Sequence, residues 1–300
     1  MRPRTLKVVD LVTLLVLSGL TLLVVAARHR LPEWNGLLLR YAILALLQIG
    51  VILGRGRGLL PVLTAFFPLI PILAIFDSLS FIPHLHPGDK DRLLLDWDRA
   101  LLGVDLSLWL EAHTRPWLTE LMQLSYLVYY VVPFLVLGAL YRKRPVASDL
   151  PRESGQPGAD FDLCVTAMAL SHYLAFVGYL TLPALGPRFA LESQFSVELT
   201  GLWLANPIHD ALNLLEGIKR DAFPSDHTSV ALLALYYAVR FTPRLVPVIA
   251  PGVFLMILST MYLRYHYLVD VLAGAALAGL CVALAPLLIR IQRSWAARAR

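Results

Sequence analysis

Ser225 and His227 stand in a segment whose residue types suit phosphate chemistry. The segment is Phe-Pro-Ser-Asp-His at residues 223–227, and its proline and serine are signals for the start of a helix. The first backbone N–H groups of a helix have no partner within the helix and attract anions. The segment therefore predicts a phosphate-binding turn, in which the Ser225 hydroxyl is an additional donor and His227 lies close to the bound group.

His266 and Asp270 form a second polar pair. They are four residues apart, a spacing that brings two side chains together on one face of a helix. A carboxylate that accepts one ring N–H fixes the histidine tautomer and leaves a lone pair on the other ring nitrogen. An imidazole held in this way can attack phosphorus. The pair therefore predicts a nucleophilic histidine.

The elements that carry these residues are predicted to cross a membrane. Hydrophobic residues make up 58% of the 300 residues and charged residues only 16%, unlike the composition of soluble domains. The predicted fold class is all-α, a polytopic membrane helical bundle of about eight transmembrane helices. The sixth span is long enough only if residues 224–226 are counted with it. The predicted spans are residues 6–27, 36–53, 59–77, 118–141, 161–183, 227–240, 243–263 and 266–290.

The basic residues predict the orientation of the chain, because cytoplasmic loops are enriched in Lys and Arg. With the N-terminus in the cytoplasm, an even number of spans returns the C-terminus there, and His227 and His266 both reach the outer face. We expect a plasma (inner) membrane protein whose active site faces outside. The first span is alternatively a cleaved signal peptide, although its apolar region is unusually long for one. The predicted cytoplasmic clusters are Arg2, Arg4 and Lys7; Arg55 and Arg57; Arg142, Lys143, Arg144 and Arg152; Arg240 and Arg244; and Arg290, Arg293, Arg298 and Arg300.

Two regions are expected: N-terminal transmembrane helices at residues 1–94 and a catalytic membrane domain at residues 95–300. Residues 97–110 interleave Trp and Leu with acids, which predicts helical segments in the outer interface. The expected partners are the lipid bilayer and a membrane lipid phosphate or phospholipid substrate. No nucleic-acid partner is expected, since the basic clusters lie beside apolar spans.

A phosphoryl group between two histidines needs positive charge around its oxygens. One histidine can attack phosphorus while the other protonates the departing oxygen, and cations then make a metal unnecessary. The predicted cations all lie in outer segments: Arg188, Lys219, Arg220 and Arg264.

At these residues the sequence resembles the type 2 phosphatidic acid phosphatase superfamily. The signatures of that superfamily are Lys-x6-Arg-Pro, Pro-Ser-Gly-His and Ser-Arg-x5-His-x3-Asp. Residues 224–227 resemble the second signature, and residues 259–270 resemble the third. The resemblance implies a six-helix catalytic core that turns over without a metal or cofactor. The implied roles are His266 as the nucleophile that forms a phosphohistidine, Asp270 as its orienter, His227 as the general acid and Ser225 as a phosphate ligand.

The sequence departs from this pattern at three points. Asp226 replaces the glycine of the second signature, Thr260 replaces the arginine of the third, and the first signature is absent. The phosphate clamp must therefore come from other cations. Arg188 is the first choice, because it follows the fifth span as the first signature would, and Arg264 is the second.

The leading functional hypothesis is a lipid-phosphate phosphatase that acts on the outer leaflet. The rival hypothesis is a lipid head-group phosphotransferase, because residues 97–110 and 185–188 resemble the inositol phosphorylceramide synthase branch of the superfamily. A transporter or scramblase is a remote alternative. It predicts charges near mid-membrane in broken helices, whereas the charges here gather at one surface.

Overall fold

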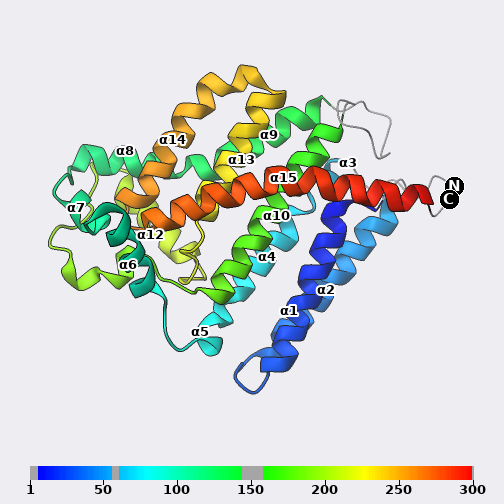
Figure 1. Ribbon diagram of the computed structural model, residues 1–300, viewed down its shortest axis with the longest axis horizontal. Coiled ribbons are helices and arrows are strands. Elements are labelled where there is room, and N and C mark those ends of the chain that lie inside the picture. Colours follow the sequence, from blue (N-terminus) through cyan, green and yellow to red (C-terminus); the bar gives the residue numbers. More distant parts are fainter. Residues whose placement is uncertain (1–5, 56–60, 144–157, 299–300) are drawn as a thin grey trace. The chain divides into compact units, whose positions relative to one another are not determined.

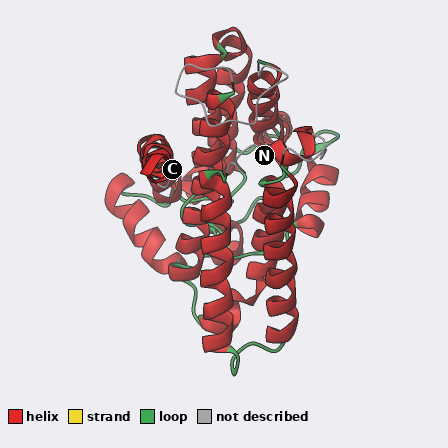
Figure 2. Ribbon diagram, turned by 90° about the vertical axis from the view of Figure 1, so that its right-hand side faces the viewer, coloured by secondary structure: helices red, strands yellow, loops and turns green. Residues whose placement is uncertain are grey.

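The computed structural model describes residues 6–55, 61–143 and 158–298, and every regular element in these ranges is helical (Figures 1 and 2). The predicted all-α class is therefore confirmed. Several residues of the predicted cytoplasmic clusters lie outside the described residues: Arg2, Arg4, Arg57, Arg144, Arg152 and Arg300.

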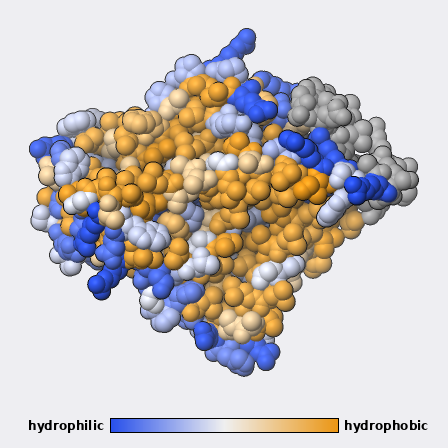
Figure 3. All heavy atoms as spheres, in the orientation of Figure 1, coloured by the Kyte–Doolittle hydropathy of each residue, from blue (hydrophilic) through white to orange (hydrophobic). Residues whose placement is uncertain are grey.

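Six helical segments of the described chain are long and apolar enough to cross a bilayer, so the chain is a multi-pass integral membrane protein. Their exposed side chains are strongly apolar. On the face drawn in Figure 3, apolar side chains cover α15 (Leu268–Arg298) as far as its basic C-terminal end, and Leu272, Leu280 and Leu287 are each about half exposed. The six segments are Val8–Ala27, Trp34–Gly54, Pro116–Arg142, Ala159–Thr181, Pro243–Tyr262 and Leu268–Trp295.

The predicted count of about eight spans is not confirmed, because two of the predicted spans are not long helices. Residues 59 and 60 of the third lie outside the described chain, and the rest is divided between α3 (Pro61–Phe66) and α4 (Leu69–Ser78). The break falls at Pro68, which cannot donate a backbone hydrogen bond. The sixth is α13 (Asp226–Phe241), whose 16 residues extend about 24 Å against the roughly 30 Å of a bilayer core.

The chain divides into two compact units. The first unit comprises Met1–Pro87, Leu140–Tyr173 and Cys281–Arg300. Within it, α1 (Val8–Ala27) and α2 (Trp34–Gly54) form a helical hairpin (Figure 1). Asp10 of α1 is fully buried and accepts hydrogen bonds from Arg55 and from Gln48 Nε2, the latter at 2.8 Å. This buried ion pair has hydrogen bonds on both carboxylate oxygens, as burial of charge requires.

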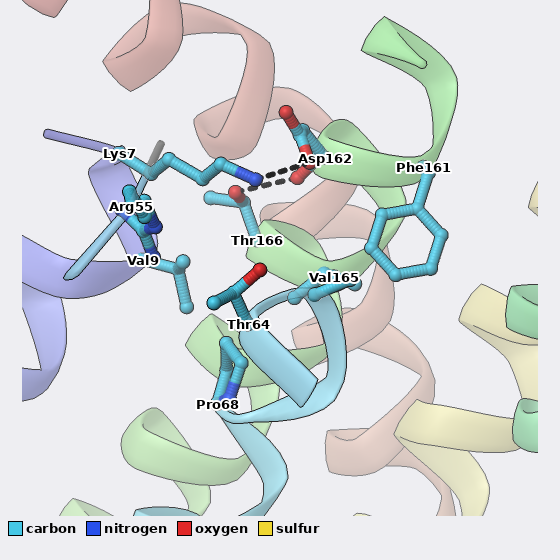
Figure 4. A pocket seen from close by; sticks show the side chains of 10 residues that line it. Lys7, Val9, Arg55, Thr64, Pro68, Phe161, Asp162, Val165 and Thr166 are labelled. Atoms are coloured by element: carbon cyan, nitrogen blue, oxygen red, sulfur yellow. Dashed lines mark hydrogen bonds and ion pairs between the residues drawn. The ribbon is translucent and has the colours of Figure 1, made fainter. Parts of the chain in front are cut away.

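A small pocket lies within the first unit (Figure 4). Lys7 reaches across it, and its Nζ lies 3.1 Å from Oδ1 of Asp162 in α10 (Ala159–Thr181). Arg55 and Thr166 also line it. Its cations already face carboxylates, and it contains none of the residues that the sequence predicts for catalysis.

The second unit comprises Gly88–Ala139 and Leu174–Leu280 and contains every predicted site residue. The predicted helical segments at residues 97–110 are α6 and α7, and Gly103 ends α6 with φ +73°. The helices of the predicted fourth span are α8 and α9. The elements of this unit not yet given are α6 (Asp91–Leu102), α7 (Leu106–Glu111), α8 (Pro116–Tyr126), α9 (Val128–Arg142), α11 (Pro187–Ala190), η2 (Glu192–Gln194), α12 (Ala205–Leu215), η3 (Pro243–Leu245) and α14 (Val246–Tyr262).

Candidate active site

His266 lies in the turn between α14 and α15 and not on a helix, which corrects the expectation that a shared helix face joins it to Asp270. The turn is held by the carbonyl oxygen of Thr260, which accepts the backbone N–H groups of Tyr265 and His266. Asp270 reaches back from the first turn of α15, and its Oδ2 lies 3.4 Å from Nδ1 of His266. The predicted proximity is thus present for a different reason.

The hydrogen bonds of His266 indicate its tautomer. Nδ1 lies 2.9 Å from the carbonyl oxygen of Ala222. A carbonyl oxygen only accepts, so Nδ1 carries the proton, and Nε2 of the neutral ring has the lone pair. The buried Asp270 carboxylate beside Nδ1 favours the same arrangement. His266 therefore presents Nε2 as the nitrogen that can attack.

His227, the second residue of α13, faces this nitrogen. Its Nδ1 lies 3.3 Å from Nε2 of His266, and its own Nε2 lies 2.6 Å from the hydroxyl of Tyr126 in α8. If His266 Nε2 accepts, His227 Nδ1 donates. The Tyr126 hydroxyl then donates to Nε2 of a neutral His227 and accepts from Nε2 of a protonated one. The structure thus brings the two predicted histidines together and adds a tyrosine that sequence reasoning missed. Its signal was a group of tyrosine hydroxyls at residues 126, 129 and 130 within an apolar span.

Ser225 is the N-cap residue of α13. Its Oγ accepts the backbone N–H of Thr228 at 3.3 Å, and its own backbone N–H donates to the Asp270 carbonyl oxygen at 3.0 Å. The side chain is fully buried and does not line the pocket that contains the histidines. The substituted Asp226 contacts a hydroxyl, with Oδ1 3.1 Å from Ser229 Oγ. The predicted role of Ser225 as a phosphate ligand stays a prediction.

Close backbone contacts align α13 with α15 and the 185–188 loop with the His266 turn. A Cβ on Gly274 would lie 2.3 Å from the Ser225 carbonyl oxygen, so only glycine allows this approach. Gly186 has φ +82°, and a Cβ there would lie 2.3 Å from the Tyr265 carbonyl oxygen. Gly274 stands in a run of small residues of α15 at positions 273–276.

Two buried acids of α6 hold the same segments. Asp98 accepts the N–H groups of Leu268 and Val269 at the start of α15, at 2.9 and 2.8 Å. Asp91 accepts the N–H groups of Leu185 and Gly186 and the hydroxyl of Tyr267. Burial raises the pKa of both carboxyl groups, although the bonds they accept oppose the shift. These acids position the loop of Arg188 and the turn of His266.

A small cavity is lined by both histidines. Of the predicted phosphate-binding residues, Arg188 alone is among its lining residues. Its Nη1 donates to Asn213 Oδ1 at 2.8 Å, its Nη2 bonds to Glu216, and its guanidinium carbon lies 4.6 Å from the ring centre of Tyr265. The lining residues are Tyr126, Leu185, Arg188, Glu216, Asp221, Ala222, His227, Tyr265 and His266.

The other three predicted cations do not line the cavity, and each bonds to another group. Arg264 donates to the Val197 carbonyl oxygen at 2.8 Å and lies 3.9 Å from Glu111. Arg220 forms a two-point ion pair with Asp89. Lys219 Nζ lies 2.8 Å from Oε2 of Glu216, which does line the cavity.

Sequence reasoning also missed the two acids of the cavity, Glu216 and Asp221. Burial raises the pKa of the Asp221 carboxyl group to about 7, and Glu216 adds to the shift, while His266 and Arg188 oppose it. Asp221 lies three residues before Pro224, and that proximity to the Pro-Ser-Asp-His motif was the available signal. The cavity thus combines a nucleophilic nitrogen, a second imidazole, one arginine and two carboxyl groups.

Comparison with known proteins identifies the family of the chain. A PA-phosphatase related-family protein from Dictyostelium discoideum is 25% identical over 173 residues, which cover 55% of this chain. The chain spans only 31% of the length of that relative. No solved structure matches. The model of the PAP2 superfamily matches residues 92–284, more than half of the chain and the whole of the histidine cavity. The chain therefore belongs to the PAP2 superfamily.

Proposed function

We propose that this chain is a lipid-phosphate phosphatase that works through a phosphohistidine on His266. The observation that carries the proposal is the arrangement of the two imidazoles: Nδ1 of His266 is held by Ala222 and Asp270, and Nε2 faces His227 within the cavity. Membership of the PAP2 superfamily supports a membrane phosphatase activity. The substrate is a membrane lipid phosphate or lipid pyrophosphate.

The first step forms a bond between His266 Nε2 and phosphorus and breaks the bond from phosphorus to the lipid oxygen. A phosphoryl group at Nε2 lies next to Nδ1 of His227, which as an imidazolium gives its Nδ1 proton to the leaving oxygen and keeps the proton on Nε2. Arg188 stabilises the negative charge of the phosphoryl oxygens. The products are the lipid alcohol and the phosphohistidine.

The second step uses water. His227, now neutral at Nδ1, takes a proton from the water as its oxygen attacks phosphorus, and the nitrogen–phosphorus bond breaks. Phosphate leaves, and His266 regains its lone pair. Splitting the reaction in this way requires positioning and charge from the protein and no redox or additional group.

Head-group transfer to a lipid hydroxyl is the second candidate function. It shares the first step and replaces water with the hydroxyl of an acceptor lipid. The observation that favours it is that Leu185 and Arg188 line the cavity, since the 185–188 segment carries the resemblance to inositol phosphorylceramide synthases. The identity of the acceptor separates the two functions.

The deciding experiment incubates the detergent-purified chain with a panel of lipid phosphates and measures released phosphate and lipid products by mass spectrometry. The phosphatase releases free phosphate, whereas the transferase makes a new phospholipid without it. His266→Ala should abolish either activity and any labelling of the chain from a radioactive substrate, and His227→Ala should slow both the formation and the hydrolysis of the phosphohistidine. His113→Ala is the matched control, because His113 is exposed and does not line the cavity. Full turnover by His266→Ala would falsify the mechanism.

We further propose that the cavity faces the extracytoplasmic side of the plasma (inner) membrane and that both termini are cytoplasmic. The support is the distribution of Lys and Arg in the sequence. Epitope tags on the two termini should react with antibody only after permeabilisation of cells. Labelling of either tag on intact cells would contradict this orientation.

A further inference from the structure

One carboxylate oxygen in the cavity bonds to two cations at once. Oε2 of Glu216 lies 2.8 Å from Nζ of Lys219 and bonds to Nη2 of Arg188. Glu216 directly follows α12, and Asn213 one turn earlier bonds to the same two cations through Oδ1 and its carbonyl oxygen. The end of α12 therefore holds both positive charges.

The same arrangement suits a phosphoryl oxygen. Arginine and lysine that converge on one oxygen form a site of the kind that recognises phosphate. Nε of Arg188 is buried and has no acceptor within the described chain, so this cation keeps a donor for a further ligand. Its guanidinium group is fixed by the rings of Phe189 and Tyr265, whose centres lie 4.5 and 4.6 Å away.

The positive charges at the cavity already face carboxyl groups. Arg188 and Lys219 supply two positive charges, and Glu216 and Asp221 are the acids beside them. The position of the Glu216 oxygen is where Nη2 of Arg188 and Nζ of Lys219 converge, so a phosphoryl oxygen that contacts both cations must replace the carboxylate there, while Nε of Arg188 offers an additional donor. Binding is therefore an exchange of one anion for another.

We propose that Glu216 is an internal competitor for the phosphoryl group and that it thereby determines which phosphate esters the cavity accepts. A doubly charged phosphomonoester replaces the single charge of the carboxylate with a net gain at the two cations. A singly charged phosphodiester gains much less. The cavity accordingly selects monoesters. This inference rests on the proposed function for the identity of the substrate.

The test compares wild type with Glu216→Gln, which keeps the shape of the side chain and removes its charge. Binding of inorganic phosphate to the detergent-purified chain is measured by ³¹P NMR line broadening, and inhibition of lipid-phosphate turnover by the same ion is measured in parallel. Loss of one charged hydrogen-bond competitor should tighten phosphate binding about tenfold. The KM for a lipid phosphomonoester should fall more than kcat changes. The affinity for a phosphodiester lipid should rise by a similar factor, so that a diester too weak to displace Glu216 in the wild type binds the variant.

Two further variants keep the result interpretable. Glu216→Asp retains the charge on a shorter side chain and should bind phosphate with intermediate affinity, which provides a second measurement if Glu216→Gln does not fold. Glu192→Gln removes the same charge from exposed η2 and should bind phosphate like wild type. A thermal melt of each variant reports folding.

The opposite outcome is equally clear. If Glu216 merely supports Arg188, its replacement by glutamine loosens that arginine, and phosphate binding weakens or stays unchanged; either result overturns the proposal. Phosphate binding by NMR does not require turnover. Tighter binding by Glu216→Gln without hydrolysis of any lipid phosphate would therefore contradict the proposed function alone, and normal hydrolysis without tighter binding would contradict this inference alone.

Discussion

The hydroxyl of Tyr126 lies 2.6 Å from Nε2 of His227, the ring nitrogen that faces away from His266. The contact engages Nε2 in both protonation states of the ring, and Nδ1 is thereby left to exchange a proton with the substrate. Tyr126→Phe removes this hydroxyl alone. We expect kcat to fall about tenfold, the effect of losing one strong hydrogen bond, with little change in KM.

Tyr130→Phe is the control for this prediction. Tyr130 is a neighbouring tyrosine of the same span, is 46% exposed and does not line the cavity. Its substitution should leave kcat at the wild-type value. Equal losses in both variants would show that Tyr126 acts through general packing and not through His227.

Arg188 and Arg264 should differ in their effects, because only Arg188 lines the cavity. Arg188→Ala removes a charged donor to the phosphoryl group, and we expect KM to rise about tenfold or more. Arg264→Ala removes a donor to the Val197 carbonyl oxygen and a contact with Phe195. It should lower the melting temperature and leave KM unchanged. Wild-type KM in both variants would place the phosphate clamp on other residues.

Gly274 and Gly279 offer a matched pair within α15. A Cβ on Gly274 would lie 2.3 Å from the Ser225 carbonyl oxygen and 3.1 Å from Thr228 Cβ, whereas nothing lies within 4 Å of one on Gly279. Gly274→Ala should push α15 from the start of α13, reduce turnover and cost about 1–3 kcal/mol of stability. Gly279→Ala should be neutral or stabilise by about 0.5–1 kcal/mol. Melting temperature and turnover in detergent measure both.

Asp221 should make stability depend on pH. The folded chain raises the pKa of this carboxyl group to about 7, mainly through burial, so between pH 4 and pH 7 the folded state binds more protons than the unfolded state. Stability contributed at this position then falls as pH rises through that window. Asp221→Asn should melt at a higher temperature than wild type at pH 8 and at the same temperature near pH 4.

Asp210→Asn serves as the control here, because Asp210 is an exposed acid of α12. Its melting curve should follow that of wild type at both pH values. A constant difference between Asp221→Asn and wild type from pH 4 to pH 8 would contradict the raised pKa.

The sequence predicted the helical class and the meeting of His227 and His266, since two successive apolar segments with opposite direction return the chain to one side. The lengths of individual spans were harder to predict. The apolar composition near Pro68 does not reveal that the helix breaks there. Ser225 is the N-cap of α13, so this helix begins at Asp226 and has only 16 residues. The division at residues 94 and 95 stays a prediction.

The partners of the predicted cations were not visible in the sequence. Arg220 pairs with Asp89, which is 131 residues away, and Arg264 lies beside Glu111. Such long-range pairs depend on the packing of segments that are distant in the chain. The spacing of His266 and Asp270 predicted their contact but not its geometry. His266 lies in the loop before α15, and Asp270 in the first turn of α15 also accepts the Tyr267 N–H at 2.8 Å.

The hydrogen bonds of Asp91 have a consequence for shortened versions of the chain. The match to the PAP2 superfamily begins at residue 92, immediately after this acid. A fragment cut at that point contains every histidine, arginine and carboxylate of the cavity, yet it leaves the N–H groups of Leu185 and Gly186 and the Tyr267 hydroxyl without their acceptor. Expression of a minimal catalytic fragment should therefore begin no later than Gly88, the first residue of the second unit.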